Sequence, residues 1–198
     1  LHAEYSTPPT SPLDLTWSGD GLDRVLPSDS GAKAADVDSD GRVLLFGSGP
    51  DGRRFTAIRY NPNGTLDTTF GGTGIVSLTG EQINPPIGGN QFQIVGLTGA
   101  VYKTGPDRGK VLIVGKGGFQ TNRFEIVRLN VDGTLDRSFG DLDPDDVLGG
   151  RLGYTRVVEF LKPGPTPTSV AIYEAGSPHA GEFVVVGGTN PGTAGVRL

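Results

Sequence analysis

The chain of 198 residues contains no cysteine, no methionine and only two histidines. Without cysteine it has no disulfide bonds, no thiolate zinc site and no thiol nucleophile. The two histidines, His2 and His179, lie far apart and share no strand pattern or helical face. A Ser-His-Asp triad or a histidine zinc site therefore has little basis. Since no other residue set forms a catalytic signature, we predict that the protein is not an enzyme.

Long apolar segments and clusters of basic residues are also missing. No apolar run approaches the roughly 18 residues that span a bilayer, so we expect no membrane insertion. The formal net charge of -5 includes no Lys/Arg block, whereas nucleic acids and anionic membranes are bound through basic surfaces. We therefore expect no nucleic-acid partner. The chain begins at Leu1, which is consistent with removal of an upstream signal peptide and with a secreted or cell-surface protein.

Turn-forming residues, in contrast, are abundant, with 33 glycines and 15 prolines. They separate the short apolar runs VLLFG, VLIVG and FVVVG, which occupy residues 43–47, 111–115 and 183–187. Short apolar runs divided by Gly, Asn, Asp and Pro are typical of strands joined by tight turns. The sequence therefore predicts an all-β fold.

An internal repeat becomes visible when the chain is aligned with itself. Residues 55–71 and 124–140 match without a gap and share the pattern F-x-x-[IV]-R-[YL]-N-x-[ND]-G-T-L-D-x-[ST]-F-G. Residues 193–198 are a third, truncated copy, and residues 13–17 match the turn of a preceding one. The arginines of the three copies are spaced 69 residues apart, at Arg59, Arg128 and Arg197.

This period predicts three tandem four-stranded repeat units in one β-propeller-like domain, because such units bury their faces by stacking on neighbours. The expected divisions are an N-terminal extension at 1–12 and units at 13–65, 66–134 and 135–198, the last truncated. The strands predicted for the middle unit are 74–78, 95–102, 110–115 and 124–130. The strand at 110–115 should be covered on both faces, whereas the alternating strand at 124–130 should have one wetter face. Propellers typically close with about four to eight blades, so three units indicate a partial propeller or a fragment; a three-fold trefoil-like barrel is the alternative.

The long motif closely resembles the delta-sixty repeat, a family of bacterial repeat proteins. The resemblance covers nearly the whole chain and rests on the shared pattern of residues 55–71 and 124–140. It implies a β-propeller-like fold and a secreted or surface-associated bacterial protein. The inserts at 80–89, 104–109, 141–152 and 163–168 distinguish this chain from the repeat pattern, and loops often carry function.

Three recurrent positions form what we call the repeat frame. We expect its aspartates to brace the turn through backbone N–H groups, its arginines to pair with these aspartates, and its aromatic residues to pack between neighbouring units. The frame residues are Asp14, Asp67 and Asp136, then Arg59, Arg128 and Arg197, then Trp17, Phe70 and Phe139.

The string DVDSDGR places Asp36, Asp38 and Asp40 at alternate positions before a glycine, as in the first half of a calcium loop. Later ligand positions hold Leu44 and Gly47, which supply no carboxylate. The alternative is that Asp40 simply opens a hairpin turn. Calcium is thus the one cofactor that the sequence suggests. The acidic residues at 141–146 have no recognised ligand spacing and are interpreted as a solvated insert.

Two functions are compatible with these observations. The first is a noncatalytic secreted or cell-surface module that serves as a structural or binding scaffold for a protein or glycan, or that joins other copies through open strand edges in a larger assembly. The alternative is an extracellular hydrolase acting on polysaccharide, with a carboxylate pair in the long loops.

Overall fold

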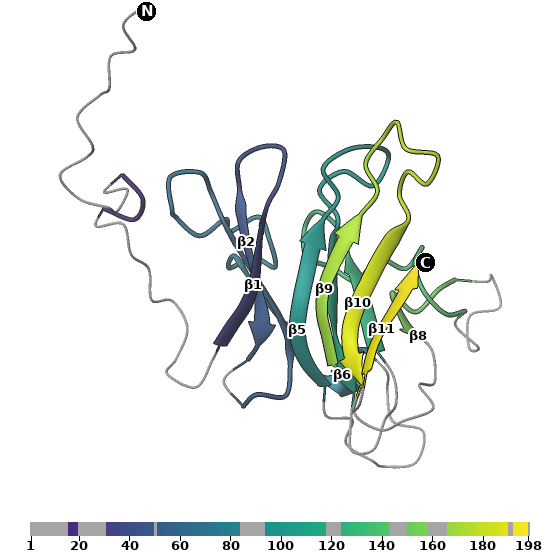
Figure 1. Ribbon diagram of the computed structural model, residues 1–198. Helices are drawn as coiled ribbons and strands as arrows, with labels where there is room; N and C mark the ends of the chain where they lie inside the picture. Colours follow the sequence, from purple (N-terminus) through teal and green to yellow (C-terminus); the bar gives the residue numbers. More distant parts are fainter. Residues whose placement is uncertain are drawn as a thin grey trace, which may run out of the picture.

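A computed structural model describes residues 16–19, 31–49, 51–83, 94–117, 124–142, 150–157, 166–189 and 192–197 (Figure 1). Within these residues the chain forms β-strands and a single helical turn, α1 (Gly80–Ile83). No helix of this part of the chain is long and apolar enough to cross a membrane. The all-β prediction is therefore confirmed.

The strands form three antiparallel sheets in which neighbours in sequence are neighbours in space. The first contains β1 (Gly31–Val37), β2 (Val43–Ser48), β3 (Phe55–Tyr60) and β4 (Ile75–Leu78). The second contains β5 (Ile94–Val101), β6 (Val111–Gly117), β7 (Phe124–Leu129) and β8 (Tyr154–Val157). The third contains β9 (Thr166–Ile172), β10 (Phe183–Thr189) and β11 (Gly192–Arg197). These separate meanders are consistent with a partial propeller, and the trefoil-like barrel was wrong because no strand pairing joins the sheets in the described residues.

The sheets stack through their first strands. The strand β5 packs against β1 and β2 on one side and against β9 on the other, and Figure 1 shows β5 and β9 side by side. One apolar cluster fills the space between the first and second sheets, and another fills the space between the second and third. This stacked arrangement is the one that repeat units with two apolar faces require.

The strand β6 contributes to both clusters. Val111 and Ile113 belong to the first cluster, whereas Leu112 and Val114 belong to the second. Successive side chains of a strand point to opposite faces, and all four residues are 0 % exposed. The prediction that this strand is covered on both faces is confirmed.

A glycine near the end of the second strand lets each sheet approach the previous one. A Cβ on Gly115 would overlap the carbonyl oxygen of Val95 and the ring of Phe55 from the first sheet. In the same way, a Cβ on Gly187 would lie 2.8 Å from Cζ of Phe124 in the second sheet. The aromatic residue that opens β3 or β7 therefore packs on a glycine of the following sheet.

The sheets divide the chain at other places than the predicted units. Residues 74–78 were expected to open the second unit, but β4 pairs with β3 and completes the first sheet. Gly74, at φ +85°, turns the chain back along β3, and its carbonyl accepts a hydrogen bond of 2.8 Å from the Arg59 N–H. Aligning the sequence with itself gives the length of a repeat but does not show at which residue a repeat begins.

The Arg-containing strand of the first sheet, β3, is buried along its whole length. Arg59 is 1 % exposed, because the second sheet covers the face of the first to which Arg59 points. Thr56 points to the opposite face and is 3 % exposed. In β7, for which one wetter face was predicted, Glu125 and Arg128 are partly exposed and the other residues are buried. These two residues lie three positions apart and point to opposite faces, so the prediction of one wetter face was wrong.

Candidate functional site

The repeat frame forms the same ion pair in both complete copies. The Nε of Arg59 lies 2.8 Å from Oδ2 of Asp67, and the Nε of Arg128 lies 2.6 Å from Oδ2 of Asp136. The aspartate side chains are 7 % and 5 % exposed. The predicted Arg–Asp pairing is therefore confirmed at these two sites.

The other oxygen of each aspartate braces its turn. Oδ1 of Asp67 accepts hydrogen bonds from the backbone N–H and the hydroxyl of Thr69, at 3.0 and 2.6 Å. Oδ1 of Asp136 accepts the same two bonds from Ser138, also at 3.0 and 2.6 Å. Burial, the largest single influence, raises the pKa of each carboxyl, but these hydrogen bonds and the nearby cations outweigh it and hold both pKa values below the ordinary range.

The frame aromatics pack on the following sheet, as expected. Phe70 is fully buried, and the guanidinium carbon of Arg59 lies 4.5 Å from its ring centroid. The ring of Trp17 lies 5.6 Å from that of Tyr60. Phe139 lies 6.2 Å from Phe183 of the third sheet. Asp14 lies outside the described residues, as does the side chain of Arg197, so their predicted roles remain predictions.

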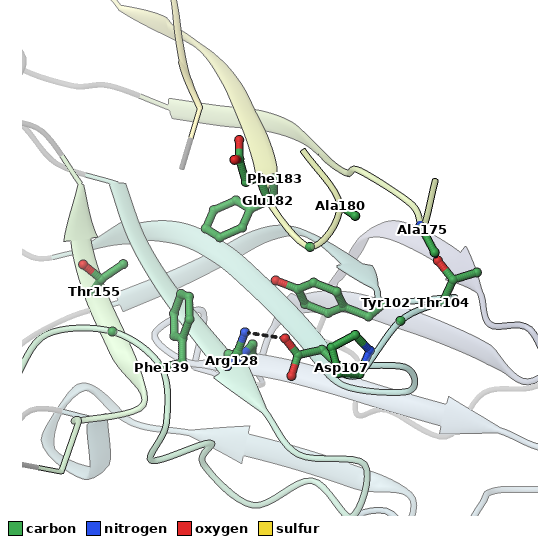
Figure 2. A pocket seen from close by; sticks show the side chains of 14 residues that line it. Tyr102, Thr104, Asp107, Arg128, Phe139, Thr155, Ala175, Ala180, Glu182 and Phe183 are labelled. Atoms are coloured by element: carbon green, nitrogen blue, oxygen red, sulfur yellow. Dashed lines mark hydrogen bonds and ion pairs between the residues drawn. The ribbon is translucent and has the colours of Figure 1, made fainter. Parts of the chain in front are cut away.

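A cavity of about 490 Å³ opens between the second and third sheets (Figure 2). Arg128 and Phe139 face it from the second sheet, and Phe183 faces it from the third. The insert at 104–109, singled out in the sequence as a variable loop, supplies one wall. This insert is tied to the third sheet, because Oγ1 of Thr104 accepts a hydrogen bond of 2.7 Å from the N–H of Ala175.

The charged groups around the cavity have partners. Asp107 lies 2.7 Å from Nζ of Lys110 and 3.1 Å from Nη1 of Arg128. Glu182 lies 3.2 Å from Nδ1 of His179. Burial, the largest influence, lowers the pKa of Lys110, but hydrogen bonds from its amine to Asp107 and Asp136 outweigh it, so the pKa lies above its ordinary value. The polar wall is thus a network of opposite charges rather than a single-sign patch.

One polar group in this cavity is not satisfied. Tyr102 is 2 % exposed, and its hydroxyl, which lies near the Arg128 guanidinium, has no hydrogen-bond acceptor in the part of the chain that the structure describes. The hydroxyl faces the cavity beside Arg128 (Figure 2). Burial raises the pKa of Tyr102. A buried hydroxyl without a partner is costly, which makes this position a candidate contact for a bound group.

The three aspartates predicted as calcium ligands form ion pairs with basic side chains and do not converge on one site. Asp38 accepts hydrogen bonds from the N–H and Nε of Arg42, at 2.9 and 2.6 Å. Asp36 pairs with Lys103 at 2.9 Å, and Asp40 pairs with Arg42 at 3.0 Å. No group of three or more His, Cys, Asp or Glu residues arranged to hold a metal occurs in the described part of the chain. The calcium site stays a prediction, while Gly41, at φ +78°, forms the hairpin turn of the alternative interpretation.

A second cavity, of about 460 Å³, runs along the first strands of the three sheets. It lies beside β1, β5 and β9, where Asp36, Lys103 and Glu174 supply its charged groups. It contains none of the frame residues. The acidic residues of the insert at 143–146 lie outside the described residues.

Sequence reasoning missed several residues that line the inter-sheet cavity, and it missed Lys110, which pairs with Asp107 of the cavity wall. Tyr102, Lys110 and Glu182 carried no recognisable motif, and Phe183 was noted only as the start of an apolar strand. One signal was present: Lys110 and Arg42 occupy the same place before the second strand of their sheets, and both lie near the frame aspartate, at 2.9 and 3.8 Å.

Two segments, residues 39–70 and 109–139, match the family model described as a domain of unknown function (DUF5122) beta-propeller. The chain carries β-propeller repeats. Each matched propeller repeat contains the second and third strands of a sheet together with the turn that carries the frame aspartate. The matched parts therefore include the frame ion pair and the frame aromatic residue. No curated protein and no solved structure matches the chain.

Proposed function

We propose that this chain is a noncatalytic repeat module of a bacterial secreted or cell-surface protein, of the delta-sixty kind, that serves as a structural and binding scaffold. The observation that carries the proposal is the contact between sheets: Nη1 of Arg59 donates a hydrogen bond of 2.6 Å to the carbonyl of Val131 in the next sheet. Its frame residues thus hold neighbouring repeats together, and this use explains why they recur.

The inter-sheet cavity is the proposed binding site. It combines aromatic faces from Phe139 and Phe183 with polar groups from Tyr102, Asp107 and Glu182, a mixture typical of sites that bind a ligand of moderate polarity. Asp107 lies between two cations, which suits a fixed charge better than the proton donor that glycoside hydrolysis requires. This arrangement supports binding over hydrolysis.

Binding and bond cleavage can be measured on the same samples. The 198-residue protein is incubated with a panel of soluble extracellular polysaccharides and proteins, and both complex formation and the release of reducing ends are followed. We expect saturable binding to a member of the panel, weakened by Phe139→Ala, without release of reducing ends above the protein-free background. Release of reducing ends that Asp107→Asn abolishes would establish the hydrolase instead.

A further inference from the structure

Asn63 and Gly64 form the one Asn-Gly pair of the sequence. An asparagine in such a pair can lose its side-chain amide without an enzyme: the backbone nitrogen of the glycine attacks Cγ of the asparagine, ammonia leaves, and a cyclic succinimide forms. Water then opens this ring to aspartate, or to isoaspartate when the main chain continues through the side chain. Glycine favours the attack because it has no Cβ that crowds the nitrogen.

The turn after β3 exposes the group that would be attacked. The side chain of Asn63 is exposed, and its Oδ1 accepts hydrogen bonds from the N–H and the hydroxyl of Thr65, at 3.1 and 2.8 Å. This oxygen gains negative charge when a nucleophile adds to Cγ. Donors that already point at such an oxygen stabilise the charge as it develops. The carboxamide is therefore polarised as well as open to water.

The attacking nitrogen, in contrast, is held away from the carboxamide. The N–H of Gly64, at φ +83°, donates a hydrogen bond of 2.9 Å to the carbonyl of Asn61. The glycine is also covered, because a Cβ there would lie 2.6 Å from the backbone nitrogen of Ser18 and 2.9 Å from Cδ2 of Trp17. The Ser18 hydroxyl donates to the carbonyl of Gly64 at 2.8 Å. The turn must leave this cover before the nitrogen can reach Cγ.

The second copy of the turn already contains the product of the reaction. Asp132 occupies the place of Asn63, and its Oδ1 accepts the same two hydrogen bonds from Thr134, at 2.9 and 2.7 Å. The glycine that follows, Gly133, has φ +87°, close to the +83° of Gly64. The hydroxyl and N–H of Thr134 lower the pKa of Asp132. An ionised aspartate therefore fits this turn without a change of its geometry.

The isoaspartate product does not fit in the same way. It lengthens the main chain by one atom between residues 63 and 64. The added atom would move Gly64 from its bond to Asn61 and press it against Trp17, which leaves no space for a Cβ. The two products should therefore differ: aspartate preserves the turn, whereas isoaspartate destabilises it.

The two turns are held with unequal strength. In the second copy the carbonyl of Asp132 accepts a hydrogen bond of 2.8 Å from the Gly71 N–H. The corresponding bond of the first copy, from the Ser18 N–H to the carbonyl of Asn63, is 3.3 Å long. Arg59 holds the second turn as well, and the aromatic residue over that turn is fully buried, whereas the one over the first is partly buried. The first turn should open more readily than the second.

We propose that Asn63 is a site of spontaneous modification, at which succinimide formation with Gly64 releases ammonia and hydrolysis yields an aspartate that the turn accepts. The contact of Trp17 and Ser18 with the turn sets the rate, because the reaction requires this cover to open. The modified protein carries one further negative charge, at the place where the second repeat holds Asp132.

Incubation of the 198-residue protein in ¹⁸O-labelled water at neutral pH tests the site, because the new carboxylate takes an oxygen from the solvent. Peptides are then analysed by mass spectrometry, with aspartate and isoaspartate separated by chromatography. We expect the label at residue 63 before any other asparagine, since the others precede proline, glutamine, arginine or valine. Aspartate should form a larger share of the product in the folded protein than in the protein unfolded in urea.

Asp132→Asn supplies a matched second site, because it creates an Asn-Gly pair in the more firmly held turn. In the folded variant, amide loss at position 132 should be at least about tenfold slower than at Asn63. In urea the two positions should react at similar rates, since the cover is then gone. Adding Ser18→Ala to this variant removes the bond to the Gly64 carbonyl and should speed loss at Asn63 about two- to tenfold, with position 132 unchanged.

The product is tested with Asn63→Asp, which should unfold at the Tm of the unmodified protein. Absence of the label at residue 63 would overturn the proposal outright. Equal rates at the two positions of the folded variant, or no effect of Ser18→Ala at Asn63, would overturn control by the cover. A Tm for Asn63→Asp well below that of the unmodified protein would show that the turn rejects the aspartate and would overturn the assignment of the product.

Discussion

Replacing Asp67 by alanine should destabilise the protein far more than replacing a surface aspartate. In the native protein the Arg59 side chain is 2 % exposed and pairs with Asp67 at 2.8 Å. Without that carboxylate, a guanidinium that water does not reach keeps the Thr69 hydroxyl and the Val131 carbonyl as its hydrogen-bond acceptors among the described residues. Breaking a buried pair by removing one partner costs about 3–5 kcal/mol.

This cost is large relative to the total free energy of unfolding. Domains are typically stable by about 5–15 kcal/mol, and each kcal/mol shifts Tm by about 2–4 °C for a chain of this size. Asp67→Ala should therefore lower Tm by about 6–20 °C in calorimetry at pH 7. The expected loss is not confined to the first sheet, because Arg59 also holds the turn of the second; amide exchange at Gly133 should accelerate too.

Asp51→Ala is the matched control. Asp51 pairs with Arg54 at 3.2 Å, but the two side chains are 46 % and 37 % exposed, and exposed pairs contribute about 0–1 kcal/mol. A second control replaces both buried partners, as Arg59→Met with Asp67→Leu, and should recover part of the lost stability. Equal Tm values for Asp67→Ala and Asp51→Ala would refute the view that the frame pair stabilises the fold.

Three further outcomes are expected. Burial raises the pKa of Asp67 and Asp136, but hydrogen bonds outweigh it and hold both pKa values below those of the unfolded chain. The free energy of unfolding should therefore be constant above about pH 5 and fall as the pH decreases below about 4. Urea unfolding at several pH values checks this. Gly115→Ala should destabilise by about 2 kcal/mol or more in urea unfolding, because its Cβ overlaps Phe55 of the first sheet. Lys110→Met, which keeps the aliphatic stem but removes the amine bound to Asp136 at 2.9 Å, should lower stability by about 1–3 kcal/mol in calorimetry.

The parts of the fold that repeat in the sequence were predictable from it. Arg59 and Asp67 lie eight residues apart in one hairpin, as do Arg128 and Asp136, so their pairing depends on local geometry that the motif itself specifies. The continuous apolar run of β6 likewise indicated burial on both faces. Recurrence at a fixed spacing distinguished these residues from catalytic candidates.

The cavity was not predictable, because it depends on how far apart two sheets lie. Tyr102 and Phe183 are distant in sequence and meet only across the second and third sheets. The residues at which each sheet begins and ends were mispredicted for a related reason. From the sequence alone, residues 74–78 fit equally well as the first strand of one unit or as the last strand of the unit before it. The structure decides between the two, because Gly74 directs these residues along β3. The burial of Arg59 depends on a neighbour that no local pattern reveals.

The contacts of Phe55 with Gly115 and of Phe124 with Gly187 give the stack a direction. The first and second sheets each offer a ring to the sheet that follows, and the second and third sheets each offer a bare glycine backbone to the sheet that precedes, so the two sides of a sheet are not interchangeable. Interfaces of this heterologous type either close into a ring or continue as an open array. Gain or loss of a whole repeat leaves every remaining interface chemically the same, whereas reversing a single sheet would place ring against ring. The lineage of such a chain can therefore change its length in steps of one repeat without redesigning its core.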